Sequence, residues 1–381
     1  MTNVFIKLKH FGILLVCFLY FLIRGKADKK KNNLSKFLVV QFASLGDMVC
    51  TTQVFRAIKN KYPQSNVVVV GNYVNKELLA NNKDVNEYIV YQNNFWHMVR
   101  KLRSGEIDFA CVTSPNFMGL ATLYLSGIPL IVAPQIVNGT SPYQTKAYKL
   151  LLSLVKAKNH NMKSYAPREY LKLLEPVDII SNDTTKHLGF SDEAKRNIEM
   201  FFETNAFNSG DLIVGISPSS GNKIKNWPAD RFAKVAEYLF DKHGAKVVIT
   251  GSNNDKVEVD KLIDFLTNKN RVINALGVFS QDELKAFISK IDLFVSVDTG
   301  PIYIAEAFNV ATIDIVGPVD EHVQPPIGQL HKVVKADRKN AEIYIMNSRV
   351  YDKKEALRQV NDITVDMVIK ECDELLSLLK K

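Results

Sequence analysis

Two carboxylates stand where an apolar segment ends and a helix would begin. The first is Asp47, which follows the apolar run 37–41 after a short turn of small residues. The second is Asp298, which directly follows the apolar run 293–297. Open α/β sheets bind ligands outside the carboxyl ends of their strands. Two such positions, far apart in the chain, predict two α/β domains that face each other across a cleft.

Asp47 is the candidate for proton transfer. A carboxylate in the first turn of a helix is kept ionised by the helix dipole. It can then accept a proton from a hydroxyl group as that oxygen attacks an electrophile. Gly46 would let a substrate approach the backbone closely. The alternative is structural, because Ser44 and Asp47 have the S-x-x-D spacing of a capping box. Spacing alone favours the structural interpretation.

A polar loop after the expected strand 212–217 is the second candidate site. It contains several serines, then Lys225, and then Trp227 just before a helix. Hydroxyl groups, backbone N–H groups and a lysine at the start of a helix suit a phosphate. The sequence therefore predicts a phosphate contact for Lys225, and a place in the core for Trp227.

The third candidate is the segment 298–301 (DTGP). The backbone amides of Thr299 and Gly300 would lie at a helix N-terminus, where they can hold a diphosphate. A plain N-cap followed by proline is the alternative, and it would be the commoner explanation if the motif stood alone.

Missing motifs narrow the chemistry further. The chain has no G-x-x-x-x-G-K-[ST] loop and no G-x-G-x-x-G after its first strand, which disfavours nucleotide hydrolysis and dinucleotide redox chemistry. It also has no D-x-D and shows no His/Cys/carboxylate cluster at metal-ligand spacing. We therefore expect no metal ion and no cofactor, with a diphosphate neutralised by lysine, hydroxyl groups and helix dipoles.

The elements that must position these residues alternate between strand and helix. In the first half we expect strands at 37–41, 66–70, 88–91, 108–113 and 130–133, the last closing the sheet. In the second half we expect strands at 212–217, 246–250, 271–274, 293–297 and 312–316. A polar segment at 205–210 separates the halves, so the predicted domains are 35–205 and 206–360, preceded by an anchor and linker (1–34) and followed by a packing helix (361–381).

One basic segment, 138–168, is harder to assign. It is rich in Tyr, Lys and Asn. Beside the cleft it could receive an acidic acceptor, but an ordinary solvated pair of helices explains the composition equally well.

Composition and charge exclude some classes of protein. The chain has 381 residues, of which 46% are hydrophobic and 23% charged, as in globular proteins of two domains. Its four cysteines show no paired spacing, which favours a reducing compartment. Of the net charge of +9, residues 1–31 carry +6 (seven basic residues and one acidic), so only +3 is left for the rest. A folded nucleic-acid-binding domain would carry the basic charge itself, so we expect a membrane and no nucleic acid.

The N-terminal segment predicts how the membrane is reached. Residues 11–23 are uncharged, and as a helix they would span about 20 Å, less than the ~30 Å hydrocarbon core. Starting at Val4, the helix is long enough to cross, with nearby lysines reaching the interface. A cleaved signal peptide is disfavoured because residues 24–31 are strongly basic and no A-x-A-like site follows. Those charges would keep the following domains in the cytoplasm. We expect an uncleaved anchor in the inner membrane, which either crosses the bilayer or lies along it.

Four short motifs occur together in a fixed order. They are S-x-G-D at 44–47, K-x-W-P at 225–228, D-[ST]-G-P at 298–301 and G-P-[TV]-[DE] at 317–320. Over roughly residues 35–328 the chain thereby resembles glycosyltransferase family 9, the ADP-heptose:lipopolysaccharide heptosyltransferases of the bacterial cell envelope.

The resemblance implies a GT-B fold of two Rossmann-like domains, with the acceptor on the first and the nucleotide-sugar on the second. It implies metal-independent transfer with inversion at the anomeric carbon, ADP-heptose as the first candidate donor, and a lipid-linked anionic glycan, the lipopolysaccharide core, as the first candidate acceptor. The implied roles are a general base for Asp47; acceptor-side positions for Ser44 and Gly46; diphosphate ligands for Ser219, Ser220, Lys225, Thr299 and Gly300; and orientation of the donor for Asp298.

The chain departs from the family pattern on the donor side. Tyr303 stands where heptosyltransferases commonly have histidine, and Val297 where asparagine is usual. The acidic residue often found after the strand ending at residue 251 comes only later, at Asp255. Two alternatives stay open. One is a GT-B-like nucleotide-sugar epimerase, which the match at 44–47 disfavours. The other is a catalytically silent member that binds carbohydrate or a partner enzyme.

Overall fold

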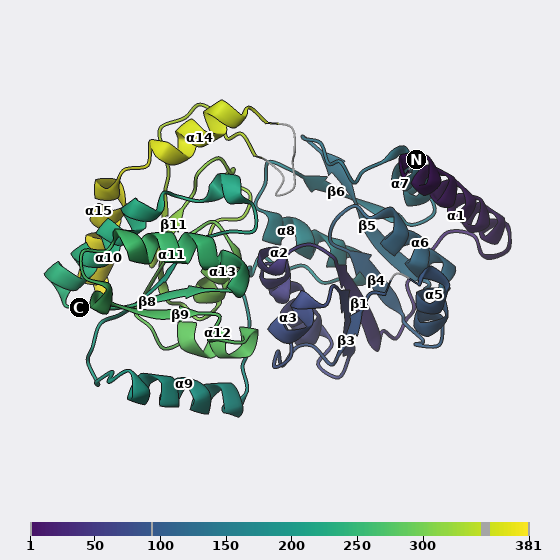
Figure 1. Ribbon diagram of the computed structural model, residues 1–381. Coiled ribbons are helices and arrows are strands. Elements are labelled where there is room, and N and C mark those ends of the chain that lie inside the picture. The colour runs from purple at the N-terminus through teal and green to yellow at the C-terminus, as the bar shows by residue number, and fades with distance from the viewer. Residues whose placement is uncertain (1, 93, 344–350, 380–381) are drawn as a thin grey trace. The chain divides into compact units, whose positions relative to one another are not determined.

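The computed structural model describes residues 2–92, 94–343 and 351–379, and the chain divides into two compact units, Met1–His187 and Leu188–Lys381. Each unit contains one six-stranded sheet in which every neighbouring pair is parallel (Figure 1). The predicted fold class, with two parallel α/β domains, is confirmed.

The sheet of the first unit has the order β3-β2-β1-β4-β5-β6. Its strands are β1 (Lys36–Gln41), β2 (Asn66–Gly71), β3 (Glu87–Val90), β4 (Phe109–Val112), β5 (Leu130–Val137) and β6 (Lys156–Asn161). The expectation that residues 130–133 close the sheet is wrong, because β6 pairs outside β5. Its sequence, KAKNHN, is polar and mostly solvent-facing, as an edge strand can be, so no apolar run marked it.

The helices of the first unit lie on both faces of this sheet. They are α1 (Thr2–Arg24), α2 (Leu45–Val49), α3 (Thr52–Lys61), α4 (Val74–Leu78), α5 (Phe95–Arg103), α6 (Phe117–Leu125), α7 (Lys146–Leu152) and α8 (Ala166–Leu171), with the 3₁₀ helix η1 (Lys172–Val177). The helical segment after β1 is divided in two, between α2 and α3. There the Thr51 hydroxyl donates to the Asp47 carbonyl oxygen at 2.7 Å, a local bond that competes with the helical pattern.

The N-terminal helix α1 packs on α6 and α7. Over Phe5–Arg24 it is long and apolar enough to cross a membrane, judged by length and composition. Its inner side nevertheless joins the hydrophobic core of the first unit through Ile13, Leu14 and Cys17. The segment expected to be an anchor separate from the domain is therefore part of the first unit.

The sheet of the second unit has the order β12-β11-β10-β7-β8-β9. Its strands are β7 (Ile213–Ser217), β8 (Lys246–Gly251), β9 (Val272–Leu276), β10 (Leu293–Val297), β11 (Ala311–Ile315) and β12 (His331–Val334). The sheet does not end with residues 312–316 as expected, because the short strand β12 pairs beyond β11. With four residues, only one of them buried, β12 has little apolar signal.

The second unit begins before the predicted boundary. Its helices are α9 (Asp192–Thr204), η2 (Lys223–Lys225), α10 (Ala229–His243), η3 (Asn253–Asp255), α11 (Lys256–Phe265), η4 (Lys269–Arg271), α12 (Gln281–Ile288), α13 (Gly300–Ala307), α14 (Lys353–Asn361) and α15 (Val365–Leu379). Helix α9 packs on α12, where Asn197 donates to Glu283 at 2.7 Å. The predicted first domain included this helix, whereas the units divide at His187. Helix α15 covers β11, β12 and α10.

Candidate functional site

Both sheets share one topology, which decides where ligands can bind. Numbered by their sequence within each unit, the strands of both sheets run 3-2-1-4-5-6, the order of a dinucleotide-binding fold. The order reverses between the first and fourth strands, and ligands bind there, beyond the carboxyl ends. Asp47 follows β1, the first strand of its sheet. Lys225 follows β7 and Asp298 follows β10, so the reversal in the second sheet brings these two residues together.

The turn that leads to Asp47 is held by side-chain amides. Ala43 donates its backbone N–H to the Gln41 side chain at 3.1 Å. The carbonyl oxygen of Ala43 accepts from Asn72 and from Asn75, both at 3.0 Å. Asn75 is completely buried, so these bonds are shielded from water. Three amide side chains therefore fix the backbone that precedes Asp47.

The capping box expected from the spacing is incomplete. Ser44 is the N-cap residue of α2, but its side chain makes no capping hydrogen bond. Asp47 lies in the first helical turn and is partly exposed. The structural explanation for Ser44 is thus wrong, while the catalytic role of Asp47 stays a prediction.

Tyr170 is a neighbour of Asp47 that the sequence did not reveal. It belongs to α8 and is 6% exposed, and its hydroxyl is hydrogen-bonded to the Gln41 side chain. Burial, together with the nearby charge of Asp47, raises the pKa of Tyr170 well above its ordinary value. The Tyr170 phenol is therefore a neutral group beside the candidate base.

The centre of the second site is a buried ion pair. Lys225 Nζ lies 2.6 Å from Asp298 Oδ2, and the two residues are 4% and 8% exposed. The other oxygen of Asp298 accepts from the Tyr303 hydroxyl at 2.5 Å. The two candidate residues thus form a direct contact that the sequence did not predict, and the N-cap residue of α13 is Thr299, not Asp298. Tyr303, which replaces the usual histidine, is one of its two partners.

A second carboxylate, Asp314 on β11, is buried close to this pair. Burial and the charge of Asp298 raise the pKa of Asp314 well above its ordinary value. For Asp298, burial acts in the same direction, but the charge of Lys225 and two hydrogen bonds outweigh it and lower the pKa. Among the described residues, Asp314 Oδ1 has no hydrogen-bond partner. Burial and the neighbouring charges therefore shift the pKa values of these two carboxyl groups in opposite directions.

The serine loop after β7 is held by its own hydrogen bonds. Ser219 donates to Asp255 Oδ1 at 2.5 Å, and Lys223 Nζ donates to Ser219 Oγ at 3.0 Å. The backbone N–H of Ser220 donates to Asn226 Oδ1 at 2.9 Å, and its hydroxyl donates to a backbone carbonyl of the loop at 2.8 Å. The roles of Ser219 and Ser220 as diphosphate ligands stay predictions, and these bonds would have to be shared or exchanged.

Asp255, the acidic residue that follows β8 only after three other residues, contacts this loop through Ser219. Asp255 also accepts from the backbone N–H and the hydroxyl of Ser252, at 2.9 and 2.7 Å. The first of these bonds, with the Asp255 backbone N–H donating to the Ser252 side chain, forms a capping box. Burial tends to raise the pKa of Asp255, but the bonds from Ser219 and Ser252 and the charge of Lys223 outweigh burial and lower it.

Helix α13 begins directly after Asp298 and points its N-terminus at the end of β10. Thr299 is the N-cap residue and makes no side-chain capping bond, and Gly300 opens the helix. The first amides of a helix lack intrahelical acceptors, so the role of the Thr299 and Gly300 amides as diphosphate ligands stays a prediction. Trp227 is 2% exposed and donates to a backbone carbonyl at 2.9 Å, which confirms it as a core residue.

The turn at 317–320 is organised by Arg338, another residue that the sequence did not indicate. The Arg338 guanidinium donates to the carbonyl oxygens of Gly317 and Val319 and forms an ion pair with Glu321. Bonds from Lys335 and Arg338 outweigh the effect of burial and hold the pKa of Glu321 at about 2.

The same turn gathers Asp320, Glu321 and His322 closely enough to ligate a metal ion. This finding corrects the expectation that the chain has no such cluster. Glu321 is already paired with two cations, however, so the group fits an ion-paired surface turn better than a metal site.

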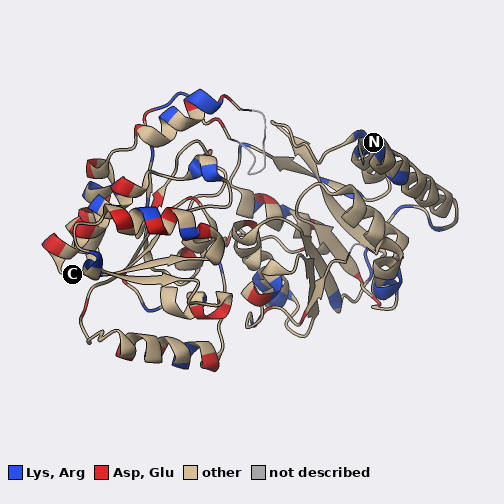
Figure 2. Cartoon of the chain, viewed as in Figure 1, with Lys and Arg blue, Asp and Glu red and all other residues tan. Residues whose placement is uncertain are grey.

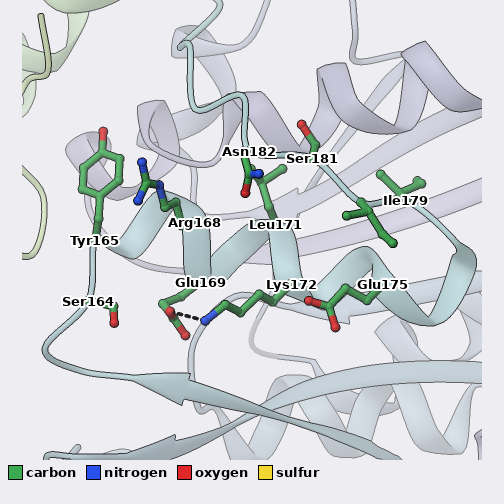
Figure 3. Close-up of a pocket in the computed structure, with 11 residues that line it drawn as sticks. Ser164, Tyr165, Arg168, Glu169, Leu171, Lys172, Glu175, Ile179, Ser181 and Asn182 are labelled. Atoms are coloured by element: carbon green, nitrogen blue, oxygen red, sulfur yellow. Dashed lines mark hydrogen bonds and ion pairs between the residues drawn. The ribbon is translucent and has the colours of Figure 1, made fainter.

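The first unit also contains a cavity of about 450 Å³, lined by α8, η1 and residues 179–182 (Figure 3). Its acidic groups are neutralised, since Lys172 pairs with Glu169 at 2.6 Å and Lys158 pairs with Glu175. Arg168 is exposed at this cavity, and no described residue forms an ion pair with it. Part of the basic segment 138–168 thus does line a hollow that could take an anionic group.

Comparison with known proteins identifies the family. The family model for glycosyltransferase family 9 (heptosyltransferase) matches residues 98–351, more than half of the chain. The chain belongs to glycosyltransferase family 9. It is therefore a glycosyltransferase, and the predicted family is confirmed. The matched region includes the motifs at 225–228, 298–301 and 317–320.

Individual relatives extend this likeness over most of the chain. The lipooligosaccharide heptosyltransferase 2 of Haemophilus influenzae is 24% identical, over 89% of this chain and 99% of that protein. Among solved structures, the ADP-heptose lipopolysaccharide heptosyltransferase II of Escherichia coli has a TM-score of 0.72 and 20% identity, and covers 91% of this chain and 100% of that one. A family 9 glycosyltransferase from Veillonella parvula has a TM-score of 0.76 and 20% identity, covering 93% and 100%. The fold of this family 9 chain is thus that of the heptosyltransferases, GT-B.

Proposed function

We propose that this family 9 enzyme transfers a sugar, with heptose the first candidate, from a nucleotide-diphosphate donor to the lipopolysaccharide core or another lipid-linked anionic glycan. Transfer proceeds with inversion, without a metal ion and without a cofactor, at the cytoplasmic face of the inner membrane. Relatives named as lipopolysaccharide and lipooligosaccharide heptosyltransferases support the acceptor class. The ADP-heptose in the name of the similar E. coli structure supports the donor.

One observation carries the donor side of this proposal: Lys225 is fixed at the reversal of the second sheet, beside the N-terminus of α13. An ammonium group has three N–H donors, and Asp298 uses one of them. The remaining two, with the amides of Thr299 and Gly300, can contact the diphosphate. Because Asp298 is committed to Lys225 and Tyr303, it orients the donor by holding the Lys225 ammonium in place.

On the acceptor side, Asp47 is the base. An acceptor hydroxyl attacks the anomeric carbon while the bond from that carbon to the diphosphate oxygen breaks. Asp47 takes the hydroxyl proton, and the nucleotide diphosphate leaves with the bonding electrons. A single displacement of this kind inverts the anomeric configuration. Removing a general base typically costs about 10²–10⁴-fold in rate, which sets the expected effect at Asp47.

The acceptor's anionic groups would lie against the first unit, with Ser44 and Gly46 close to the reacting hydroxyl. The cavity of about 450 Å³ beside Arg168 is large enough for a sugar-sized group. Changing Arg168 to Gln should raise the KM for the acceptor several-fold, since it removes a cation that no described residue neutralises. The KM for the donor should stay the same.

The test is nucleotide-diphosphate release by the purified enzyme, with a panel of nucleotide-sugars and lipid acceptors, before and after treatment with EDTA. Wild type is compared with Asp47→Asn and with Asp192→Asn, a matched control because Asp192 also lies in the first turn of a helix and is exposed. We expect release that requires acceptor, survives EDTA and falls at least about a hundredfold in Asp47→Asn only. The anomeric configuration of the product, read by NMR, should be opposite to that of the donor.

The remaining outcomes each contradict a part of the proposal. Unchanged release in Asp47→Asn would remove Asp47 as the base. Loss of activity with EDTA that returns with a metal ion would refute metal independence. Binding of a nucleotide-sugar without release from any donor would indicate a silent binding protein.

A further inference from the structure

Helix α1 is docked on the first unit along one side. Ile13, Leu14 and Cys17 are 7%, 9% and 0% exposed and belong to the core that α6 and α7 share. Ring contacts fix its direction, because His10 lies 4.4 Å from Phe117 and Tyr20 lies 6.0 Å from Tyr124, measured between ring centroids. The helix therefore runs beside α6 for about 15 Å at 1.5 Å per residue.

The C-terminal end of α1 is fastened as well. The Arg24 guanidinium donates to the backbone carbonyls of Tyr124 and Ile128 and lies 4.9 Å from the Tyr124 ring centroid. The Tyr124 hydroxyl donates to the Gly25 carbonyl at 2.7 Å. Just beyond, Ala27 donates to the Leu154 carbonyl at 2.9 Å. The helix and the residues that follow it are thus bonded directly to the domain.

The opposite side of α1 is apolar and exposed. Its large side chains with half or more of their surface exposed include Phe11, Leu15, Leu19, Leu22 and Ile23. Residues 11, 15, 19 and 22 follow the three- and four-residue spacing that places side chains on one helix face. An exposed apolar stripe of this kind marks an interaction site.

Charge indicates what covers this stripe. Lys7 lies one turn before Phe11, and Lys26 lies four residues after Leu22; both are exposed. Between Lys9 and Arg24 the helix has no charged residue, and Figure 2 shows it uncharged along its middle. An apolar stripe bounded by lysines fits the acyl boundary of a bilayer with anionic headgroups, to which the lysines can reach.

We propose that α1 lies in the plane of an anionic membrane, with the stripe of residues 11, 15, 19 and 22 in the acyl boundary, and does not cross the bilayer. To cross, the helix would have to pull Ile13, Leu14 and Cys17 out of the core and break the bonds of Arg24. In the plane, it keeps these contacts and buries only the face that is already exposed. This inference rests on the membrane association proposed above, and it would place the acceptor-binding unit against the surface that holds a lipid-linked acceptor.

The first experiment is flotation of the full-length protein with vesicles of phosphatidylcholine alone or with about 30% phosphatidylglycerol. Wild type should float with the anionic vesicles. Leu19→Glu, in the middle of the stripe, should reduce the bound fraction at least about tenfold. Val257→Glu is the matched control, because Val257 is a similarly exposed apolar residue (59%) on α11 in the second unit. It should bind like wild type.

The second experiment distinguishes an in-plane helix from a crossing one. Single cysteines at Phe11, Leu15, Leu19 and Leu22 carry an NBD fluorophore, and lipids with nitroxides at different acyl depths quench it. The four native cysteines are buried, and labelling of wild type measures their background. We expect one shallow depth at all four positions. A depth that passes through the bilayer centre from one end to the other would overturn the proposal.

Two further outcomes have separate meanings. Wild type that never floats would refute membrane association, while sugar transfer to a water-soluble acceptor would still be measurable and would test the proposed function independently. A dimer by sedimentation that Leu19→Glu dissociates, without lipid binding, would make the stripe an interface between two copies and overturn the inference.

Discussion

The ion pair between Lys225 and Asp298 gives a quantitative prediction about stability. Both side chains are almost fully buried, and removing one partner of such a pair costs about 3–5 kcal/mol, because the other charge stays buried without compensation. In Lys225→Met, the Tyr303 hydroxyl would be the partner left to Asp298 among the described residues, with Asp314 nearby. We therefore expect a loss near 4 kcal/mol in the free energy of unfolding, a large part of the 5–15 kcal/mol that is typical of a domain.

The double variant Lys225→Met/Asp298→Asn should lose less than the single variant Lys225→Met. It leaves no unpaired charge, and replacing a buried pair by neutral groups is often close to neutral. The side-chain amide introduced at position 298 can still accept from the Tyr303 hydroxyl through its carbonyl oxygen. The coupling energy between the two positions should then be about 2 kcal/mol or more, within the range seen for residues in contact.

Urea unfolding followed by tryptophan fluorescence measures these values in the correct unit. The chain has two tryptophans, and Trp227 is buried in the core of the second unit. A Trp96→Phe background leaves Trp227 as the only reporter. Lys234→Met is the control, since Lys234 forms an exposed pair with Asp230 at 3.5 Å, which should contribute at most about 1 kcal/mol. If Lys225→Met costs no more than this control, or if the effects at 225 and 298 are additive, the reasoning is wrong.

Three further variants test neighbouring contacts. The pKa of Asp314 is raised in the folded state, so its contribution to stability is present below the unfolded pKa of 3.8 and is lost as the pH rises through the folded pKa. Asn at this position resembles the protonated carboxyl group at every pH. In urea unfolding, the free energy of unfolding of Asp314→Asn should therefore match that of wild type near pH 3.5 and exceed it at pH 8. Tyr303→Phe removes the 2.5 Å hydrogen bond to Asp298, which should lower the free energy of unfolding by about 2 kcal/mol. Calorimetry should also show weaker binding of the donor to Tyr303→Phe, whereas Tyr303→His should retain donor binding. Asn75→Ala removes one of the bonds that hold the turn before Asp47 and should lower kcat by up to about a hundredfold, the scale of a misplaced catalytic group, with an unchanged Kd for the donor.

The central strands of both sheets could be predicted from the sequence for a physical reason. Strands such as β1 and β10 are buried on both faces, so they are continuous apolar runs that stand out from helices. The outer strands β6 and β12 have one neighbour each and carry polar residues, and both were missed. Helix α9 lies within the range 35–205 predicted for the first domain, but periodicity shows only that a helix has an apolar face. It does not show which sheet the face covers, so α9 was assigned to the wrong side of the boundary.

The residues of the candidate site likewise include some that the sequence indicated and some that it did not. Asp47, Lys225 and Asp298 could be found because each stands at the end of an apolar run in a short motif. Tyr170 and Asp314 could not, because only the packing of distant elements brings them beside Asp47 and Asp298. A polar residue inside an apolar strand, as in ATIDI at 311–315, was the one local signal that could have pointed to Asp314.

The presence of Tyr303 in place of a histidine changes the charge available beside Lys225 and Asp298. A histidine can carry a positive charge, whereas Tyr303 contributes a neutral hydroxyl that already donates to Asp298. The nearby cations are balanced too, Lys225 by Asp298 and Lys223 by Glu258 at 3.1 Å.

A departing diphosphate in this chain would therefore be stabilised mainly by groups that are oriented before it arrives. These are the remaining N–H donors of Lys225 and the amides at the start of α13. Fixed donors of this kind need no reorganisation as negative charge develops. Lys223 is half exposed, so it is the cation that could turn from Glu258 towards a phosphate. Lys223→Gln should then reduce kcat more in a Tyr303→Phe background than in a Tyr303→His background, because only the histidine could replace the lost charge.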